Sequence, residues 1–310
     1  MNVCYAVTSA GWDQYAQMAC VSALLVKRWH PAARITIFGD EITCSQLERQ
    51  RNKLVESVDQ VVRVQTGGLP TATQRSRFVK TTMRQNVSGD FIYLDADTIP
   101  LGRFDELLRQ SEPLGAALEH NRGLDDQFFP SDMPSFYERL GWRHPAVPYF
   151  NAGVLVVRDC PDAHTLFRSW HKKWRQSLQT GSHQDQPALN SAIFDGGHKV
   201  RILDPSFNAM VSYFYSPWRF RGARIAHFFS ANPIGGTLLS HLVDHLGKTN
   251  EIDWEAYEAC RRQGHPWAHG GEPWQLWRSG NYTRALAKKI ARRWKHSRQN
   301  RSALDLPHRS

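Results

Sequence analysis

Short apolar runs alternate with longer amphipathic stretches along the first third of the chain. The runs are rich in β-branched and aromatic residues, as buried strands are, and the stretches repeat apolar residues every three or four positions, as helices do. The predicted elements are strands at 2–8, 34–38, 58–64 and 91–98 and helices at 14–29, 44–55 and 73–86. Because this alternation is typical of βαβ units, we expect an α/β, Rossmann-like fold with a mostly parallel central sheet and helices on both faces.

The pattern is less regular in the second half of the chain. The predicted elements there are strands at 113–119, 150–157, 199–203 and 223–228, a polar loop at 121–134, and helices at 162–177, 184–194, 238–246, 253–263 and 282–296. The strand–helix alternation ends near residue 235. We therefore expect an α/β domain over residues 1–235 and a helical, basic extension over residues 236–310, with a disordered tail from about residue 299.

The net charge of +10 belongs to the end of the chain. Residues 261–310 hold 12 Lys and Arg against 2 Asp and Glu, whereas residues 1–260 hold 27 of each kind. A nucleic-acid-binding body is expected to carry a basic surface of its own. The balanced charge of this body therefore predicts no nucleic-acid partner.

The predicted helix at 282–296 separates apolar and basic residues onto two faces. The apolar face holds Tyr282, Leu286, Ile290 and Trp294, and the basic face holds Arg284, Lys288, Arg292 and Lys295. Such a helix suits the anionic surface of a membrane. It could equally pack its apolar face on the rest of the protein, and the sequence leaves both interpretations open.

The cysteines and the first residues of the chain bear on the cellular compartment of the protein. The five cysteines are scattered and odd in number, which fits neither a zinc pattern nor a disulfide framework. Met1–Val7 lacks the basic and long apolar regions of a signal peptide, and no apolar run approaches the roughly 20 residues of a membrane span. We expect a reduced, cytoplasmic setting, with peripheral attachment to the inner face of the membrane where the basic helix binds lipid.

The predicted strand at 91–98 begins with four bulky apolar residues, Phe91–Leu94, which run directly into two carboxylates, Asp95 and Asp97. Alternate strand residues share a face, so the strand pattern predicts that both carboxylates point the same way. Their repulsion is relieved if a hard divalent cation such as Mg²⁺ or Mn²⁺ lies between them. In parallel sheets, ligands bind beyond the carboxyl ends of the strands, where Asp95 and also Thr8 lie. The alternative is that the two acids merely begin a surface loop.

Five motifs in order along residues 3–233 resemble those of a known family. They are Val7–Tyr15, Tyr93–Asp97, Phe150–Leu155, Asp185–Asn190 and Ile225–Phe228. With them the chain resembles GT-A-fold nucleotide-sugar glycosyltransferases, closest to the glycogenin and lipopolysaccharide galactosyltransferase family, glycosyltransferase family 8. The resemblance implies a GT-A fold and transfer of a sugar from a nucleotide-diphosphate sugar, a UDP-sugar above all, to a glycan or lipid-linked acceptor.

The resemblance also implies a metal site. Asp95, Asp97 and His227 would hold one divalent ion that bridges the two phosphates of the donor. Imidazole is a softer ligand than carboxylate, which favours Mn²⁺ over Mg²⁺. Taken alone, His227 is one of 14 histidines and could simply pack at a strand end.

The donor nucleotide would lie on residues after the first strand. In the resembling family Thr8, Asp13 and Tyr15 match positions that cradle the nucleotide, and Ala96 and Gly153 belong to the same donor site. A tyrosine ring can stack on a base, and a hydroxyl or carboxylate can bond base or ribose. The alternative is structural, with Asp13 capping the helix at 14–29 and Tyr15 in the core.

Further residues are implied around the sugar. Asn151, Asp185 and Gln186 would line its pocket, and the resemblance implies retention of anomeric configuration by a front-face mechanism with no general base. Arg77 and Lys80 lie one helical turn apart and would face phosphate or sugar, unless they form a solvated helix face. Asp185 could alternatively be a plain helix N-terminal carboxylate.

One departure from the family pattern concerns the diphosphate. The family usually carries a glycine and a lysine shortly after the late histidine, and Phe228–Pro233 contains neither. Arg77 or another basic residue would then supply the missing charge. Two other functions stay open. A nucleotidyltransferase is disfavoured because Thr8–Asp13 lacks the glycine-rich basic loop of that class. A non-catalytic sugar-nucleotide or membrane-surface binding protein would need no intact metal site.

Overall fold

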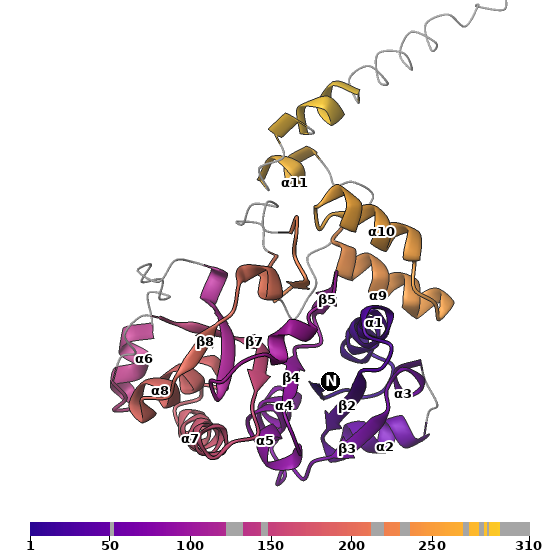
Figure 1. Ribbon diagram of the computed structural model, residues 1–310. Coiled ribbons are helices and arrows are strands. Elements are labelled where there is room, and N and C mark those ends of the chain that lie inside the picture. The colour runs from indigo at the N-terminus through magenta and orange to yellow at the C-terminus, as the bar shows by residue number, and fades with distance from the viewer. Residues whose placement is uncertain are drawn as a thin grey trace, which may run out of the picture.

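The centre of the molecule is a seven-stranded sheet with the strand order β3-β2-β1-β4-β7-β6-β8, seen in a computed structural model (Figure 1). The structure describes residues 1–49, 53–121, 133–143, 148–211, 220–229, 236–268, 273–278, 282–283 and 285–291. The strands are β1 (Asn2–Val7), β2 (Arg34–Gly39), β3 (Gln60–Arg63), β4 (Phe91–Leu94), β6 (Leu114–Leu118), β7 (Phe150–Val157) and β8 (Val200–Ile202).

The sheet is mostly parallel, as predicted. Strands β3, β2, β1 and β4 pair in parallel, and β6 pairs in parallel with β8. Strand β7 runs against both of its neighbours, β4 and β6. The start of β7 therefore lies beside the end of β4, and this places Phe150–Gly153 at the same sheet edge as Asp95.

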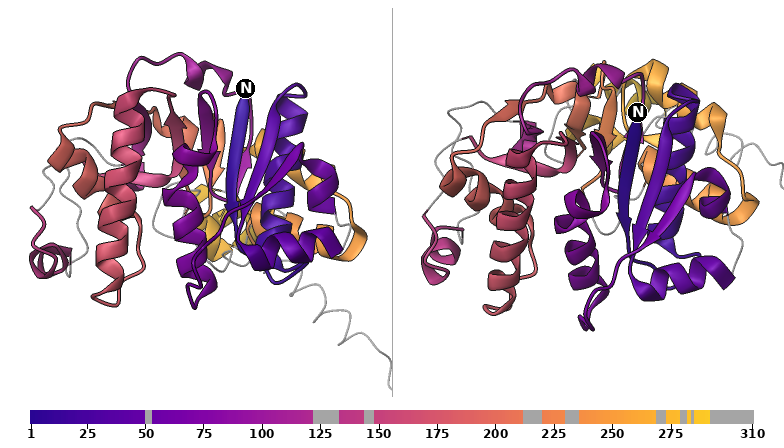
Figure 2. Two further views of the ribbon diagram at one scale, coloured as in Figure 1. Left: turned by 90° about the horizontal axis from the view of Figure 1, so that it is seen from below. Right: turned by 60° about the horizontal axis from the view of Figure 1, so that its bottom comes forward.

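Helices cover both faces of the sheet (Figure 2). The named helices of the described residues are α1 (Gln14–Trp29), α2 (Glu41–Arg49), α3 (Lys53–Ser57), α4 (Ala72–Thr81), α5 (Met83–Asn86), α6 (Met133–Arg139), α7 (Pro161–Leu178), α8 (Gln186–Gly196), α9 (Leu238–Thr249), α10 (Trp254–Gln263) and α11 (Pro273–Arg278), of which α11 lies away from the sheet (Figure 1). Alternate residues of each strand feed two cores. In β1, Val3 and Val7 pack on the side of α1 and α9, and Cys4 packs on the side of α4 and α7.

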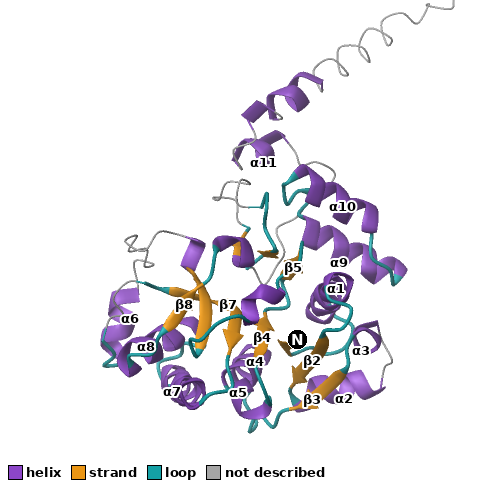
Figure 3. Ribbon diagram, viewed as in Figure 1, coloured by secondary structure: helices purple, strands orange, loops and turns teal. Residues whose placement is uncertain are grey.

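A second, three-stranded sheet has the order β5-β10-β9. Its strand β5 is labelled in Figure 3. Its strands are β5 (Thr98–Pro100), β9 (Ala209–Met210) and β10 (Ile225–His227), flanked by 3₁₀ turns η1 (Asp105–Leu108), η2 (Glu119–Asn121) and η3 (Pro205–Asn208). The predicted single strand at 91–98 is therefore wrong. The chain leaves the large sheet at Leu94, turns through Asp95–Asp97 and enters the small sheet at Thr98, whose N–H and hydroxyl both donate to the Asp95 carbonyl.

Two other predicted helices are divided. The stretch 44–55 spans α2 and α3, with residues 50–52 outside the described part, and 73–86 breaks at Thr82 between α4 and α5. Helix α4 starts one residue earlier than predicted because Thr71 and Gln74 form a capping box. Part of the predicted loop 121–134, residues 122–132, lies outside the described residues.

The C-terminal helices α9 and α10 pack against α1 in the same core as the large sheet. The predicted boundary at residue 235 lies in a segment outside the described residues and stays a prediction. Residues 282–283 and 285–291 are helical, in agreement with the predicted helix at 282–296; Arg284, residues 292–296 and the predicted tail lie outside the described part. Within the described residues, no helix combines the length and apolar character needed to cross a bilayer.

Candidate active site

A cavity of about 700 Å³ opens at the carboxyl edge of the large sheet. Its walls come from the ends of β1 and β4, from the starts of α1, α8 and β7, and from α4 and β10. All the residues that the sequence singled out lie in this one cavity: Thr8, Asp13, Tyr15, Arg77, Lys80, Asp95, Ala96, Asp97, Asn151, Gly153, Asp185, Gln186 and His227. The roles predicted for them stay predictions, and the fold brings them together.

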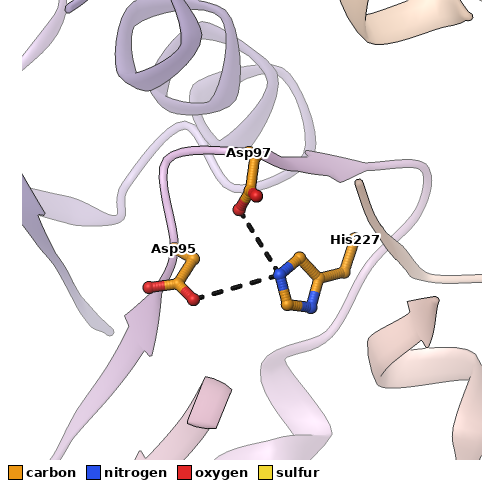
Figure 4. Close-up of side chains that lie close together, drawn as sticks. All are labelled: Asp95, Asp97 and His227. Atoms are coloured by element: carbon orange, nitrogen blue, oxygen red, sulfur yellow. Dashed lines mark ion pairs between the residues drawn. The ribbon is translucent and has the colours of Figure 1, made fainter. Parts of the chain in front are cut away.

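Asp95, Asp97 and His227 converge at the junction of the two sheets (Figure 4). Nε2 of His227 lies 3.4 Å from Oδ1 of Asp97 and 3.9 Å from Oδ2 of Asp95. Around a six-coordinate ion with ligands at about 2.1 Å, adjacent ligand atoms lie about 3 Å apart and opposite ones about 4.2 Å apart. The two distances from Nε2 of His227 fall in this range, and one ligand atom from each residue lies within 4.8 Å of the others, so the three side chains are grouped closely enough to be candidates for one divalent cation.

The carboxylates converge through a turn, which replaces the predicted strand alternation. The N–H of Asp95 donates to the carbonyl of Gly153 in β7 (2.8 Å), and the N–H of Phe228 donates to the carbonyl of Asp97 (2.9 Å). The turn is thus tied to both sheets, and β10 delivers His227 to the open side of the two acids.

Gly153 gives the imidazole of His227 its place. A Cβ at this position would lie 2.1 Å from Cε1 of His227, 2.7 Å from Nδ1 and 2.8 Å from Nε2. Only glycine, which has no Cβ, leaves this space free. In the structure, the missing side chain makes room for a metal-ligand candidate.

His227 is buried and held by a neighbouring amide. Its Nδ1 lies 2.9 Å from Oδ1 of Asn208. Burial lowers the pKa of His227, but the carboxylates of Asp97 and Asp95 outweigh burial and raise it above its ordinary value. The pocket therefore favours positive charge at Nε2, as a proton or as a metal ion.

A network of opposite charges joins the metal-site candidates to the predicted sugar side. Nζ of Lys80, which is almost fully buried, lies 3.1 Å from Asp95 and 3.3 Å from Asp185. Nε of Arg77 lies 3.0 Å from the other oxygen of Asp185. Burial raises the pKa of Asp185, yet Lys80 and Arg77 outweigh burial and hold it below its usual value. Asp185 lies at the N-cap position of α8, as the alternative of a helix N-terminal carboxylate expected, but its side chain makes no capping hydrogen bond and pairs with Lys80 and Arg77.

Polar side chains from three elements meet on the predicted sugar side. Nε2 of Gln186 donates to Oε2 of Glu119 (2.6 Å), and Oε1 of Gln186 accepts from the N–H of Ala152 (3.1 Å). Nδ2 of Asn151 donates to the same oxygen of Glu119 (2.9 Å). The amides of Asn151 and Gln186 are therefore fixed in direction before any ligand arrives.

The predicted nucleotide side has mixed outcomes. Asp13 caps α1, accepting from the N–H groups of Tyr15 and Ala16, and also accepts from Ala10. Tyr15 is 44% exposed at the cavity wall, so the prediction that it could belong to the core is wrong. The hydroxyl of Thr8 donates to the carbonyl of Ala72, which ties the end of β1 to α4.

Sequence reasoning missed several cavity residues. Glu119, His120, Tyr149 and Phe229 line the cavity, and Asn208 supports His227 from beneath. They come from 3₁₀ turns and strand ends, and no motif or periodicity marks them. The polar entrance to the apolar run at 150–157 was a usable signal, since it placed Asn151 at a strand end beside them.

The arrangement of the sheet and helices is that of a GT-A-type α/β transferase, and solved structures with this fold match the chain. The galactosyltransferase LgtC, solved with donor and acceptor sugar analogues, has a TM-score of 0.54 at 18% identity, covering 83% of this chain and 100% of LgtC. GlyE from Streptococcus pneumoniae TIGR4 has a TM-score of 0.51 at 15% identity, covering 87% of this chain and 66% of GlyE. The bifunctional WbbM has a TM-score of 0.52 at 15% identity, covering 84% of this chain and 51% of WbbM. At such identities these matches show a shared fold.

The sequence model of glycosyl transferase family 8 matches residues 77–230, which include most of the cavity residues. No curated protein matches the sequence. The resemblance seen in the motifs is thereby confirmed: the chain carries a glycosyl transferase family 8 domain and is a hexosyl-type glycosyltransferase that takes its sugar from a nucleotide sugar. The nucleotidyltransferase and non-catalytic alternatives are not supported.

Proposed function

We propose that this enzyme transfers a hexose from a UDP-sugar to a glycan or lipid-linked saccharide, with a divalent ion held by Asp95, Asp97 and His227. The observation that carries the proposal is the convergence of these three ligands inside the cavity of a family 8 domain. The imidazole ligand supports Mn²⁺ in preference to Mg²⁺.

In this proposal the donor spans the cavity from β1 to α8. Tyr15 stacks on the base at its exposed ring, and Thr8 and Asp13 hold base or ribose. The sugar lies against Asn151 and Gln186. The backbone of Ala96 and Gly153 lines the floor between nucleotide and sugar, next to the metal ligands.

The bound ion supplies Lewis-acid stabilisation of the departing diphosphate. Arg77 and Lys80 add positive charge beside it, and their pairing with Asp185 fixes where that charge lies. This arrangement offers a substitute for the family lysine that the chain lacks after His227.

We further propose that transfer retains the anomeric configuration. The acceptor oxygen bonds to the anomeric carbon on the face from which the phosphate oxygen leaves, and the acceptor proton passes to that phosphate oxygen. Glu119 is the cavity carboxylate that accepts a hydrogen bond from Gln186, and two amide donors already occupy its Oε2. We therefore assign it no nucleophilic role, and Gln186 lies near the reacting carbon as a hydrogen-bonding group.

A thermal-shift panel tests the donor and the metal together. UDP-glucose, UDP-galactose, UDP-N-acetylglucosamine and GDP-mannose are each added with Mn²⁺, with Mg²⁺ and with EDTA. A donor at 100 times its Kd stabilises the native state by about 2.7 kcal/mol. We expect a UDP-sugar to raise Tm with Mn²⁺ and not with EDTA.

Two variants make the panel specific. Asp97→Asn should abolish the Mn²⁺-dependent shift, and Asp244→Asn, at an exposed position of α9, should leave it unchanged. An equal shift of wild type in EDTA, or a full shift of Asp97→Asn with Mn²⁺, would show that the metal assignment is wrong.

We also propose that the basic C-terminal helix docks the enzyme on an anionic membrane at the cytoplasmic face. Tyr282, Leu286 and Ile290 are each about half exposed, and the ring of Tyr282 contacts that of Trp277, which is also exposed. Cosedimentation with phosphatidylglycerol vesicles should exceed that with phosphatidylcholine vesicles. Leu286→Glu with Ile290→Glu should remove the difference; retention of full binding would contradict the proposal.

A further inference from the structure

A continuous line of hydrogen bonds runs from His227 to Glu119. Nδ1 of His227 lies 2.9 Å from Oδ1 of Asn208, and Nδ2 of Asn208 lies 3.0 Å from Oδ1 of Asn151. Nδ2 of Asn151 lies 2.9 Å from Oε2 of Glu119. The line thus links a metal-ligand candidate in the small sheet to a carboxylate on the far side of β7.

The direction of each amide in this line follows from groups that can only donate or only accept. The N–H of Gly153 donates to Oδ1 of Asn151 (2.8 Å), so the nitrogen of Asn151 must face Glu119. Because Oδ1 of Asn151 accepts, the atom of Asn208 that faces it must be nitrogen. The oxygen of Asn208 then faces His227, and Nδ1 of His227 must carry the proton.

Gln186 is fixed by the same logic. Its oxygen accepts from the N–H of Ala152, so its nitrogen faces Glu119, at 2.6 Å. The carboxylate of Glu119 is therefore the common acceptor of two amide donors. Asn208 is fully buried and Asn151 nearly so, and water does not compete for these bonds.

We propose that Glu119 is a positioning residue that, together with the backbone N–H of Gly153, holds the direction of the whole line, keeps the proton of His227 on Nδ1 and leaves Nε2 for the divalent ion. The proposal rests on the metal site proposed above. Glu119 touches neither the ion nor the reacting atoms in this scheme. It acts through Asn151 and Asn208, since a histidine ligand binds metal only through the nitrogen that its second hydrogen bond leaves free.

A competing explanation is that Glu119 attracts the cation by charge alone. Two substitutions separate the explanations. Glu119→Met removes both the charge and the acceptor oxygens at similar size, and Glu119→Gln removes the charge but can keep an oxygen toward the two amides. If Glu119 acts as an acceptor, Gln restores what Met destroys. If Glu119 acts by charge, both substitutions have the same effect.

Two readouts are measured on the full chain. Long-range ¹⁵N–¹H spectra of the histidine rings, assigned with His227→Asn and recorded at a pH where His227 is neutral, report the tautomer without metal. Titration with Mn²⁺ reports the affinity for the ion. We expect Glu119→Met to mix the tautomers of His227 and lower Mn²⁺ affinity by about 10- to 100-fold. Glu119→Gln and the exposed control Glu106→Met should each stay within about threefold of wild type.

The Asn208→Ala background gives the decisive comparison. Asn208→Ala alone should also mix the tautomers, and Glu119→Met should then change Mn²⁺ affinity no further, because the line is already broken. An undiminished effect of Glu119→Met in this background, or an unchanged tautomer in Glu119→Met, would overturn the proposal. If wild type binds no Mn²⁺ although His227 has the Nδ1–H tautomer, the metal proposal fails and the positioning role remains. If Glu119→Met does not fold, the tautomer of His227 in Asn208→Ala still tests the proposal.

Discussion

Gly153→Ala is the sharpest single test of the metal site, because it adds one methyl group and removes no polar atom. The new Cβ would lie 2.1 Å from Cε1 of His227, whereas ordinary contacts of this kind begin at 3.4 Å. The ring must therefore retreat by about 1.3 Å, unless β7 shifts instead. Metal–ligand distances tolerate only about 0.2 Å.

The retreat should take His227 out of the coordination sphere. Losing one of three protein ligands is at least as severe as the loss of a supporting hydrogen bond, which costs up to about 100-fold in metal affinity. We expect Mn²⁺ affinity to fall by about 100-fold or more, equivalent to about 2.7 kcal/mol. Titration with Mn²⁺ in the presence of UDP measures this affinity. Urea unfolding in EDTA measures the loss of stability caused by overpacking, expected at about 1–3 kcal/mol.

Gly247→Ala provides the matched control. It adds the same methyl group in α9, where the nearest atoms, at 3.3 Å, belong to the flexible end of Gln17. It should leave Mn²⁺ affinity unchanged. If Gly153→Ala is stable and binds Mn²⁺ as tightly as wild type, then His227 does not ligate the ion and the reasoning from the glycine is refuted.

Further substitutions separate stability from binding. Lys80→Met removes a buried cation that pairs with Asp185 and Asp95 and should cost about 3 kcal/mol in urea unfolding, whereas Lys27→Met, at an exposed pair, should cost under about 1 kcal/mol; equal costs would contradict the burial argument. Burial lowers the pKa of His171 to about 4 from its ordinary 6.5. As pH falls, the unfolded chain therefore binds a proton at His171 before the folded chain does, and the free energy of unfolding drops between about pH 7 and about pH 5. His171→Gln should flatten the dependence of the urea midpoint on pH in this range. Tyr15→Ala should weaken UDP binding by about tenfold in calorimetry with unchanged stability, since its ring is exposed. Asp13→Ala should instead cost about 1 kcal/mol of stability, because it caps α1, and an unchanged unfolding midpoint would contradict that role.

The sequence pattern was sufficient for the parallel half of the sheet and for placing Thr8 and Asp95 at one sheet edge. Apolar runs and helical spacing are local properties, and the carboxyl ends of parallel strands share one edge, so Thr8 and Asp95 could be placed together from local patterns alone. His227 was found only because motifs in order linked it to a strand 130 residues earlier. The geometry of the pair was predicted for the wrong reason, since a turn and not strand alternation aims Asp95 and Asp97.

The remaining site residues had no local signal. Glu119 and Asn208 lie in 3₁₀ turns whose positions depend on β6, β9 and β10 packing together, which single-sequence patterns do not reveal. Gly153 carried a signal whose meaning needed the structure, because its partner His227 comes from another sheet. Tyr15 fits the helical apolar period and yet is exposed at the cavity wall.

Helix α10 covers the edge of the small sheet at β5. Strand β5 is an edge strand, and the hydroxyl of Tyr257 donates to the carbonyl of Pro100 while accepting from Nε1 of Trp29. Unpaired edge carbonyls invite pairing with a second chain. A shortened chain ending at residue 235 would expose this edge together with the apolar face of α1 and would tend to aggregate. The extension up to residue 268 therefore keeps the protein soluble by covering the sheet that carries His227.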